Sequence, residues 1–284
     1  MKRTMVVIAL AGIFLVGPME ASATVIFLSA GADAAAIQNT VDAYRAVLGN
    51  PNNLNNPGPL PSGRREINWD GGGPPVIDGT PAVTPFTTFQ NTRGATFTTP
   101  GNGLTQAAAT GGALSLSTIN PTYANLFAPF SANRLFAPTG SNVTLGAFSV
   151  PGSGGAVAAG VQGFGAVFSD VDLAGDTTIE YFDVNGKSLG VFDVPAFTGN
   201  KTFSFLGIIR GPNESLIGSI RIVTGTDPLG PNTNESATVD LVVMDDFFYG
   251  EPQKTPQPSS AQLLGLALLT VAAMSRFVRA RIRR

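Results

Sequence analysis

The hydrophobic residues between 32 and 48 recur at the spacing of an α-helix. Their side chains fall on one face, and Gly49-Asn50-Pro51 ends the run. This face contains Ile37, Val41, Tyr44, Val47 and Leu48. We therefore expect one N-terminal amphipathic helix, followed over 50–63 by a linker rich in Pro and Asn.

From Arg64 onwards, short apolar stretches alternate with turn residues, which predicts β-strands. The stretches cover 142–150, 161–168, 177–182, 189–194, 203–209, 216–223 and 239–249. Asn185-Gly186, between two of them, is a strong hairpin signal. In segment 80–130, where Gly, Thr and Ala dominate from Thr99 to Thr118, we expect loops and short strands. This rhythm indicates a mainly β, jelly-roll-like β-sandwich over 64–250.

Phenylalanines recur within the predicted strands and are the natural filling of a sandwich core. Two sheets that pack face to face bury their inward side chains between them. The residues expected there are Phe148, Phe164, Phe168, Phe182, Phe192, Phe203, Phe205 and Phe247.

The N-terminus has the three parts of a secretory signal peptide over 1–23. Lys2-Arg3 is followed by an apolar run from Met5 to Gly17 and then by Ala21-Ser22-Ala23. We expect cleavage after Ala23, so that 24–63 begins the mature chain. The alternative is a retained anchor, for which the apolar run is shorter than the roughly 20 residues of a membrane span.

The C-terminus combines a linker over 251–260, an apolar stretch from 261 and five arginines within the last nine residues. A helix of about 14–18 residues covers about 21–27 Å, a marginal span that arginines reaching the lipid head groups would complete. The arginines would stay in the cytoplasm, with the body outside. A surface helix is the alternative, but the stretch has no polar face.

Pro256-Gln257-Pro258, the apolar helix and the arginine tail over 261–284 together resemble the PEP-CTERM sorting signal of Gram-negative bacteria. Gln257 stands where that signal has Glu. The resemblance implies an exported protein that is anchored in the membrane or released at the cell surface. It also implies an exosortase-type processing enzyme as a partner and a connection with exopolysaccharide or biofilm.

Residues 64–250 resemble a group of exported bacterial proteins that begin with the same Arg-Glu-Ile-Asn-Trp-Asp-Gly run, which here covers 65–71. Residues 163–172 and 244–247 are further similar stretches. This resemblance implies the sandwich and the location, and it implies no activity.

Charge and composition exclude several classes of function. Seven of the 17 basic residues but only one of the 19 acidic residues lie in the terminal segments, so 24–258 carries a net charge of −8. An acidic body argues against nucleic-acid binding. The chain has no Cys and no His. Disulfides, Ser-His-Asp and Cys-His catalysis, and zinc sites built on His or Cys are therefore excluded.

Asp170, Asp172 and Asp176 form one candidate metal site. Closely spaced carboxylates in a loop that contains Gly175 suit Ca²⁺, which binds six to eight oxygens in flexible geometry. The alternative is three solvated turn residues, a common role for Asp.

Asp245-Asp246 lies within an apolar strand and forms a second candidate site. Strand alternation predicts that the two side chains point to opposite faces, so that one of them enters the core. A buried carboxylate needs a partner. Glu66, Asp70 and one of the pair would then bind a structural Ca²⁺. Ion pairing is the alternative that the sequence favours, with Arg64, Arg65 or Arg134.

Trp69 is the single Trp and would stack against a sugar ring, or else fill the core. Paired carboxylates also catalyse glycoside hydrolysis. The candidate pairs are Glu66 with Asp70 and Asp245 with Asp246. We favour a non-catalytic surface protein that binds polysaccharide or forms part of the extracellular matrix. A structural or adhesive protein without a specific ligand is the alternative, and a hydrolase is a third.

Overall fold

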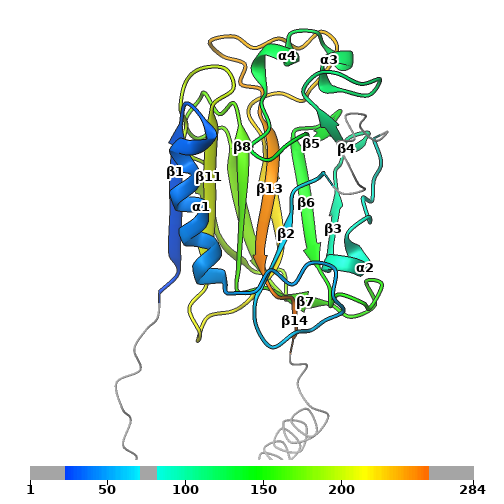
Figure 1. The fold of residues 1–284 in the computed structure, drawn as a ribbon, viewed down its shortest axis with the longest axis vertical. Helices are drawn as coiled ribbons and strands as arrows, with labels where there is room; N and C mark the ends of the chain where they lie inside the picture. The colour runs from blue at the N-terminus through cyan, green and yellow to red at the C-terminus, as the bar shows by residue number, and fades with distance from the viewer. Residues whose placement is uncertain (1–22, 71–81, 256–284) are drawn as a thin grey trace, which may run out of the picture.

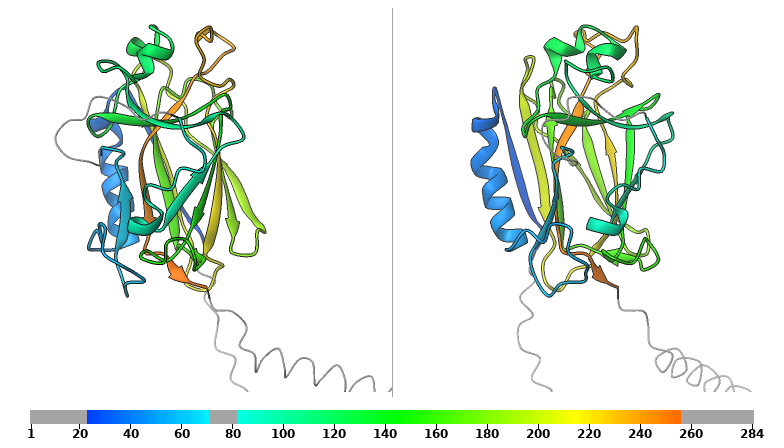
Figure 2. Two further views of the ribbon diagram at one scale, coloured as in Figure 1. Left: turned by 90° about the vertical axis from the view of Figure 1, so that its right-hand side faces the viewer. Right: turned by 45° about the vertical axis from the view of Figure 1, so that its right-hand side comes forward.

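The computed structural model describes residues 23–70 and 82–255. Two antiparallel sheets face each other, which confirms a mainly β fold (Figures 1 and 2). The large sheet has the order β1-β11-β8-β13-β5-β4, with β2 also paired to β13, and the small sheet has the order β10-β9-β12-β6-β3.

The strand bounds agree closely with the stretches predicted between 142 and 249. The large sheet contains β1 (Val25–Gly31), β2 (Arg64–Ile67), β4 (Gly103–Ala108), β5 (Arg134–Thr139), β8 (Gly163–Ser169), β11 (Phe203–Ile209) and β13 (Val243–Gly250). The small sheet contains β3 (Ala95–Thr98), β6 (Val143–Phe148), β9 (Thr178–Asp183), β10 (Ser188–Asp193) and β12 (Ile217–Val223). The short strands β7 (Ala159–Gly160) and β14 (Gln253–Lys254) pair with each other.

The predicted helix is confirmed as α1 (Ala34–Leu48), which packs on the outer face of the large sheet beside β1 and β11 (Figure 2). Asp33 begins it, because its carboxylate accepts a 3.0 Å hydrogen bond from the backbone N–H of Ala36. The predicted apolar face is buried except at Val47, which is 55% exposed. Strand β1 precedes α1 and was not predicted, because its uncharged run of apolar residues lacks a clear alternation.

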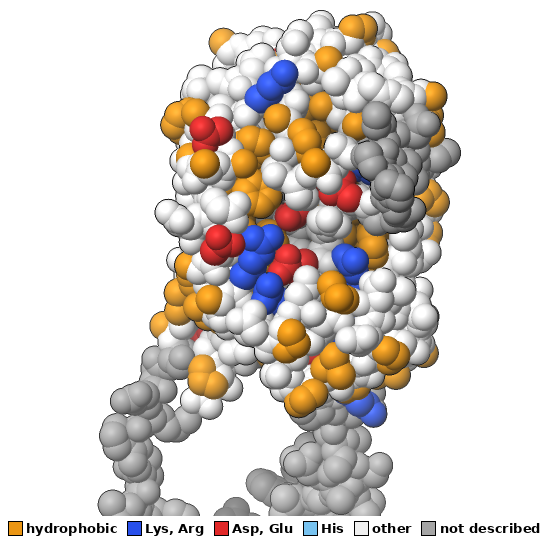
Figure 3. All heavy atoms as spheres, viewed as in Figure 1, with side chains coloured by type: hydrophobic (Ala, Val, Ile, Leu, Met, Phe, Trp, Pro, Cys, Tyr) orange, Lys and Arg blue, Asp and Glu red, His pale blue; other side chains and the backbone are white. Residues whose placement is uncertain are grey.

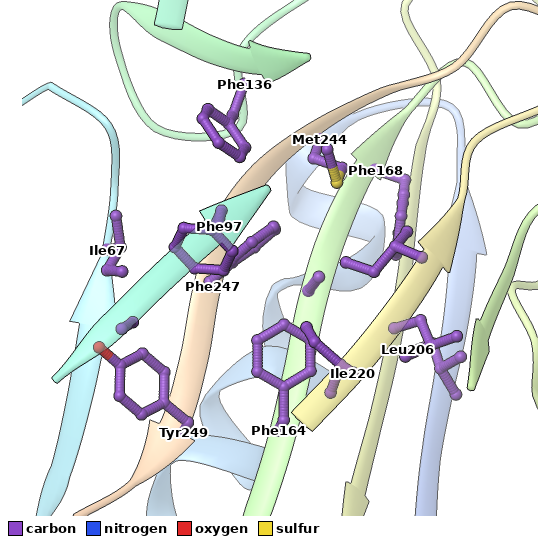
Figure 4. Close-up of a cluster of buried hydrophobic side chains, with 14 of the residues drawn as sticks. Ile67, Phe97, Phe136, Phe164, Phe168, Leu206, Ile220, Met244, Phe247 and Tyr249 are labelled. Atoms are coloured by element: carbon purple, nitrogen blue, oxygen red, sulfur yellow. The ribbon is translucent and has the colours of Figure 1, made fainter. Parts of the chain in front are cut away.

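The main core lies between the two sheets. Figure 4 shows large-sheet aromatic residues such as Phe164, Phe247 and Tyr249 facing Phe97 and Ile220 of the small sheet. Of the predicted core phenylalanines, four lie in this cluster and are buried: Phe148, Phe164, Phe168 and Phe247. Two others, Phe203 and Phe205, are buried on the opposite face of the large sheet, under α1. The last two, Phe182 and Phe192, are partly buried.

Local turn chemistry explains the connection between β9 and β10. The predicted Asn-Gly hairpin joins β9 to β10, with Gly186 at φ +81°. The Asp183 carboxylate accepts hydrogen bonds from the backbone N–H groups of Asn185 and Lys187 at 2.8 and 2.9 Å. Segment 80–130 also contains helices too short to give a periodic pattern, namely α2 (Gln90–Arg93), α3 (Leu116–Ile119) and α4 (Tyr123–Leu126).

The described chain begins and ends at the same end of the sandwich (Figure 1). The predicted signal peptide up to residue 22 and the predicted C-terminal helix over 261–284 lie outside the described residues. Within 23–70 and 82–255, no helix has the length and hydrophobicity of a membrane span.

Candidate functional site

Four acidic residues gather at the end of the sandwich opposite the described chain ends. Asp170 and Asp172 follow β8, whereas Glu235 and Asp240 belong to the long connection between β12 and β13 (Figure 1). We call these four residues the loop-end cluster. Asp172 and Glu235 also line a cavity of about 430 Å³. Because β8 and β13 are neighbours in the large sheet, segments about 65 residues apart in sequence meet here.

Backbone hydrogen bonds fix three of the carboxylates. Asp172 accepts from the N–H group of Gly199 at 2.8 Å. Asp240 accepts from the N–H groups of Asp172 and Leu173, each at 3.2 Å. The inner carboxylate, that of Asp170, accepts from the N–H group of Lys201 at 3.1 Å through one oxygen. The loop-end cluster is thus held by loop geometry and not by cationic side chains.

Three carboxylate oxygens in the loop-end cluster are buried without a hydrogen-bond partner. They are Oδ2 of Asp170, which is a fully buried residue, and both side-chain oxygens of Glu235. Across 23–70 and 82–255, neither residue has a Lys or Arg nitrogen within 4.0 Å. A buried carboxylate without a counter-charge is costly, so this arrangement needs a proton or a cation.

The electrostatics of the loop-end cluster favour protonation when no cation is bound. Burial, followed by the charge of Glu235, raises the pKa of Asp170 to about 9. Burial and the charges of Asp172 and Asp240 raise the pKa of Glu235 to about 7. Burial and the charges of Asp172 and Asp176 raise the pKa of Asp240 to about 6. Asp176, the third predicted ligand, therefore lies near enough to interact with Asp240.

These pKa shifts predict that the cation-free protein loses stability as the pH rises. The folded chain retains protons on Asp170 and Glu235 that the unfolded chain has released above about pH 4, so the free energy of unfolding falls with rising pH. The fall should extend from about pH 4 to about pH 9, the folded-state pKa of Asp170. Urea unfolding in EDTA at pH 5, 7 and 9 would measure it.

The variant Asp170→Asn separates the loop-end cluster from other titrating groups. It removes the carboxyl group whose pKa is raised furthest in this cluster, so the unfolding free energy of the variant should depend less on pH. Asp193→Asn is the control, because Asp193 is exposed on β10. An identical pH dependence in the parent chain and Asp170→Asn would contradict the prediction.

The described residues do not bring three carboxylates into a completed coordination sphere. In the part of the chain that the structure describes, no group of three or more acidic residues has the arrangement of a metal site. Asp170, Asp172 and Asp240 are fixed by backbone hydrogen bonds, but both Glu235 oxygens are without one. The Glu235 carboxyl nevertheless lies close enough to those of Asp170 and Asp172 to share a proton with them, and a cation would take the place of that proton.

The second predicted group also assembles, on the outer face of the large sheet. Asp245 and Asp246 lie where β13 carries one extra residue relative to β8, since the register shifts between Met244 and Phe247. The expectation that alternation separates the two side chains is therefore wrong. Both are buried, and both carboxylates accept hydrogen bonds from the same loop, from the Phe130 N–H at 2.5 Å and the Ser131 hydroxyl at 2.6 Å.

Glu66 and Asp70 join this bulge to form what we call the face cluster. Figure 3 shows acidic and basic side chains gathered side by side near the middle of this face of the molecule. Burial and the charge of Asp246 raise the pKa of Asp245, on which the charge of Asp70 also acts. Burial likewise raises the pKa values of Asp246 and Asp70. Asp70 accepts hydrogen bonds from the backbone N–H groups of 133–134.

Arginines supply much of the counter-charge in the face cluster, as in the ion-pairing alternative. Arg64 contacts Glu66 at 2.6 Å. Arg45, a residue of α1 that the sequence did not mark as a partner, lies 3.3 Å from Glu66 and 3.7 Å from Asp246. Arg65 points elsewhere and pairs with Glu251. Within the described residues, arginines of the face cluster therefore pair with Glu66 and Asp246, whereas the loop-end cluster has no such ion pair. Oδ1 of Asp245 and Oδ2 of Asp70 are nevertheless buried without a hydrogen-bond partner, as are oxygens of the loop-end cluster.

Trp69 fills the core and presents no surface for a sugar. Its side chain is 0% exposed and stacks on Phe136 with ring centroids 3.7 Å apart. Its indole N–H donates to the backbone carbonyl of Asp245 at 2.8 Å. In this position Trp69 cannot stack against a sugar ring. It is the core residue of the alternative interpretation.

Comparisons with known proteins add no assignment to this geometry. Neither a family model, nor a curated protein, nor a solved structure matches the chain.

Proposed function

We propose that this chain is an exported, non-catalytic cell-surface protein whose β-sandwich binds Ca²⁺ at the loop-end cluster. The observation that carries the proposal is the set of three buried, unpartnered carboxylate oxygens of Asp170 and Glu235. They face no cationic side chain within the described ranges.

Calcium suits this set of donors better than other common ions. Ca²⁺ prefers oxygen ligands and tolerates irregular geometry, whereas the chain has no His or Cys for softer metals. Asp170, Asp172 and Glu235 would supply carboxylates, and Asn200 and Ser236 of the adjoining cavity carry further oxygens. Binding would also remove the repulsion that raises the pKa values of Asp170 and Glu235.

The order of the strands supports a jelly roll as the finer description of the fold. Strands β5-β13-β8-β11 of the large sheet and β6-β12-β9-β10 of the small sheet are eight strands in two facing sheets. Consecutive strands cross between the sheets, except at the β9–β10 hairpin. This architecture occurs in lectins among many other proteins, so it supports binding without identifying a ligand.

The position of the loop-end cluster agrees with a surface role. The described chain ends at Thr255, at the opposite end of the sandwich (Figure 1). A membrane-embedded tail after that point, processed or not by an exosortase-type enzyme, would leave the cavity facing outward. Its lining includes Thr198, Asn200 and Ser236, which are suited to the hydroxyl groups of an exopolysaccharide. A structural matrix role without a specific ligand is the alternative.

A hydrolase is less well supported by the positions of the acidic pairs. Asp245 is 0% and Asp246 3% exposed, so a glycosidic bond does not reach them in this conformation. Glu66 is held in ion pairs by Arg45 and Arg64. The proposal therefore leaves these carboxylates a structural role.

Thermal unfolding of the full chain tests calcium binding. After treatment with EDTA, excess Ca²⁺ should raise the Tm, because a ligand that binds only the folded state stabilises it by about 2.7 kcal/mol at 100 times its Kd. Mg²⁺ should raise the Tm less, since it demands a stricter geometry.

Two variants show whether the response comes from the loop-end cluster. Asp170→Asn should abolish most of the Ca²⁺-induced rise in Tm, whereas Asp193→Asn, on exposed β10, should preserve it. An unchanged Tm of the parent chain in excess Ca²⁺, or an equal loss in both variants, would refute the proposed site.

A further inference from the structure

Strand β1 forms an edge of the large sheet that is open over its whole length. Its seven residues pair in unbroken antiparallel register with β11. Within the described residues, no strand and no isolated bridge pairs with its other side. Such an edge presents a row of unpaired N–H and C=O groups that can accept another strand.

The other sheet edges are covered, charged or irregular. Val83 bridges to Leu104 along β4, and Phe86 bridges to Phe97 along β3. Strand β10 ends in Asp193 and has a register shift at Gly190, both of which discourage edge pairing. Strand β2 is short and carries three charged residues. Strand β1 has none of these protections.

The side chains of β1 add an exposed apolar surface to the open backbone. The run Val-Ile-Phe-Leu-Ser-Ala-Gly contains no charge and no Pro. Val25, Ile26 and Leu28 are 50%, 46% and 51% exposed. Phe27, which points to the other face, packs against Tyr44 of α1 with ring centroids 5.3 Å apart. By alternation, Ile26 and Leu28 therefore share the face that α1 leaves uncovered.

We propose that β1 pairs with β1 of a second copy of this chain, antiparallel and about a two-fold axis near Phe27. The two large sheets would then form one continuous sheet across the dimer. In this register Ile26 lies opposite Leu28 of the second copy, and Leu28 lies opposite its Ile26. The exposed apolar side chains would cover one another, and the α1 helices would flank the junction on the other face.

A second copy fits this edge for two reasons. An antiparallel two-fold interface sets a strand against itself, and β1 has no charge that self-pairing would bring face to face with a like charge. The strand also begins only two residues after Ala23, where cleavage is predicted. The mature chain would therefore retain almost nothing ahead of β1 that could cover its edge.

Single cysteines test the register in a chain that has no Cys of its own. Full-length Ile26→Cys and Leu28→Cys chains with tags of different size would be co-expressed, and membranes would be oxidised mildly. Because paired strands bring opposite Cβ atoms to about 4.5–5.5 Å, we expect covalent heterodimers on a non-reducing gel. Their yield should be several-fold above that of Val191→Cys, a residue that is 57% exposed on β10.

A charged variant provides a second measurement that does not depend on disulfide formation. Leu28→Lys should convert the dimer to a monomer in light scattering, because in this register each Lys would lie against the apolar Ile26 of the second copy and diagonally to the other Lys. Val191→Lys, on β10, should leave the dimer intact. Cross-linking no greater than that of Val191→Cys would overturn the proposal. A monomeric parent chain would do the same, whether a retained segment 1–22 or another molecule covers β1.

Discussion

Replacing Glu251 by Gln should lower the free energy of unfolding by about 3–5 kcal/mol, because it leaves the guanidinium of Arg65 buried without its counter-charge. Both side chains are buried, and the pair is bidentate, with Nε–Oε2 at 2.6 Å and Nη2–Oε1 at 2.8 Å. Glu251 also accepts from Asn53 Nδ2 at 2.9 Å and from the Leu60 N–H at 3.1 Å. Urea unfolding monitored by circular dichroism would measure the loss.

Removing both charges should be much less harmful than removing one. The double variant Arg65→Met/Glu251→Leu should recover most of the loss, since a buried ion pair often contributes little net stability over an apolar pair. Asp42→Asn is a surface control, because Asp42 pairs with Arg45 but is 57% exposed, and it should cost less than about 1 kcal/mol. A loss for Glu251→Gln no greater than that for Asp42→Asn would contradict this account.

This ion pair shows where prediction from the sequence failed. The sequence marked Arg65 as a partner for Asp245 or Asp246, and its actual partner, Glu251, lies 186 residues away. The pairing follows from the register of β2 on β13, which sets Arg65 beside Tyr249 near the end of the strand. No local sequence pattern specifies the register of β2 on β13.

The elements that were predicted are those with a local cause. Helix α1 follows from a 3.6-residue repeat that Gly49-Asn50-Pro51 ends, and the β9–β10 hairpin follows from Asn185-Gly186. The bulge at Asp245-Asp246 breaks the alternation on which the prediction of opposite faces depended.

Both acidic clusters were found only in part. The spacing of Asp170 and Asp172 marked a candidate site, but Glu235 and Asp240 come from another loop and carry no signal of their own in the sequence. Only the adjacency of β8 and β13 joins them. In the face cluster, the counter-charge from Arg45 depends on how α1 packs against the sheet, which a helical pattern does not determine.

Replacing Trp69 by Ala should cost about 3–5 kcal/mol of unfolding free energy, the range for large aromatic side chains in a packed core. The ring stacks on Phe136 with an interplanar angle of 3° and has edge contacts with Phe97 and Phe247. Truncation would also leave the Asp245 carbonyl without its indole donor. Circular dichroism must follow the unfolding, because this substitution removes the only Trp in the chain.

Trp69→Phe separates the packing from the hydrogen bond. It retains an aromatic ring in the core but no donor for Asp245, so its loss should be smaller than that of Trp69→Ala. Leu54→Ala is the exposed control, since Leu54 is 57% exposed, and it should change stability little. If Trp69→Ala were as stable as Leu54→Ala but bound polysaccharide less well, Trp69 would be a ligand-stacking residue after all. Because Trp69 is enclosed by aromatic rings in the core, we expect Trp69→Ala to be much less stable than Leu54→Ala.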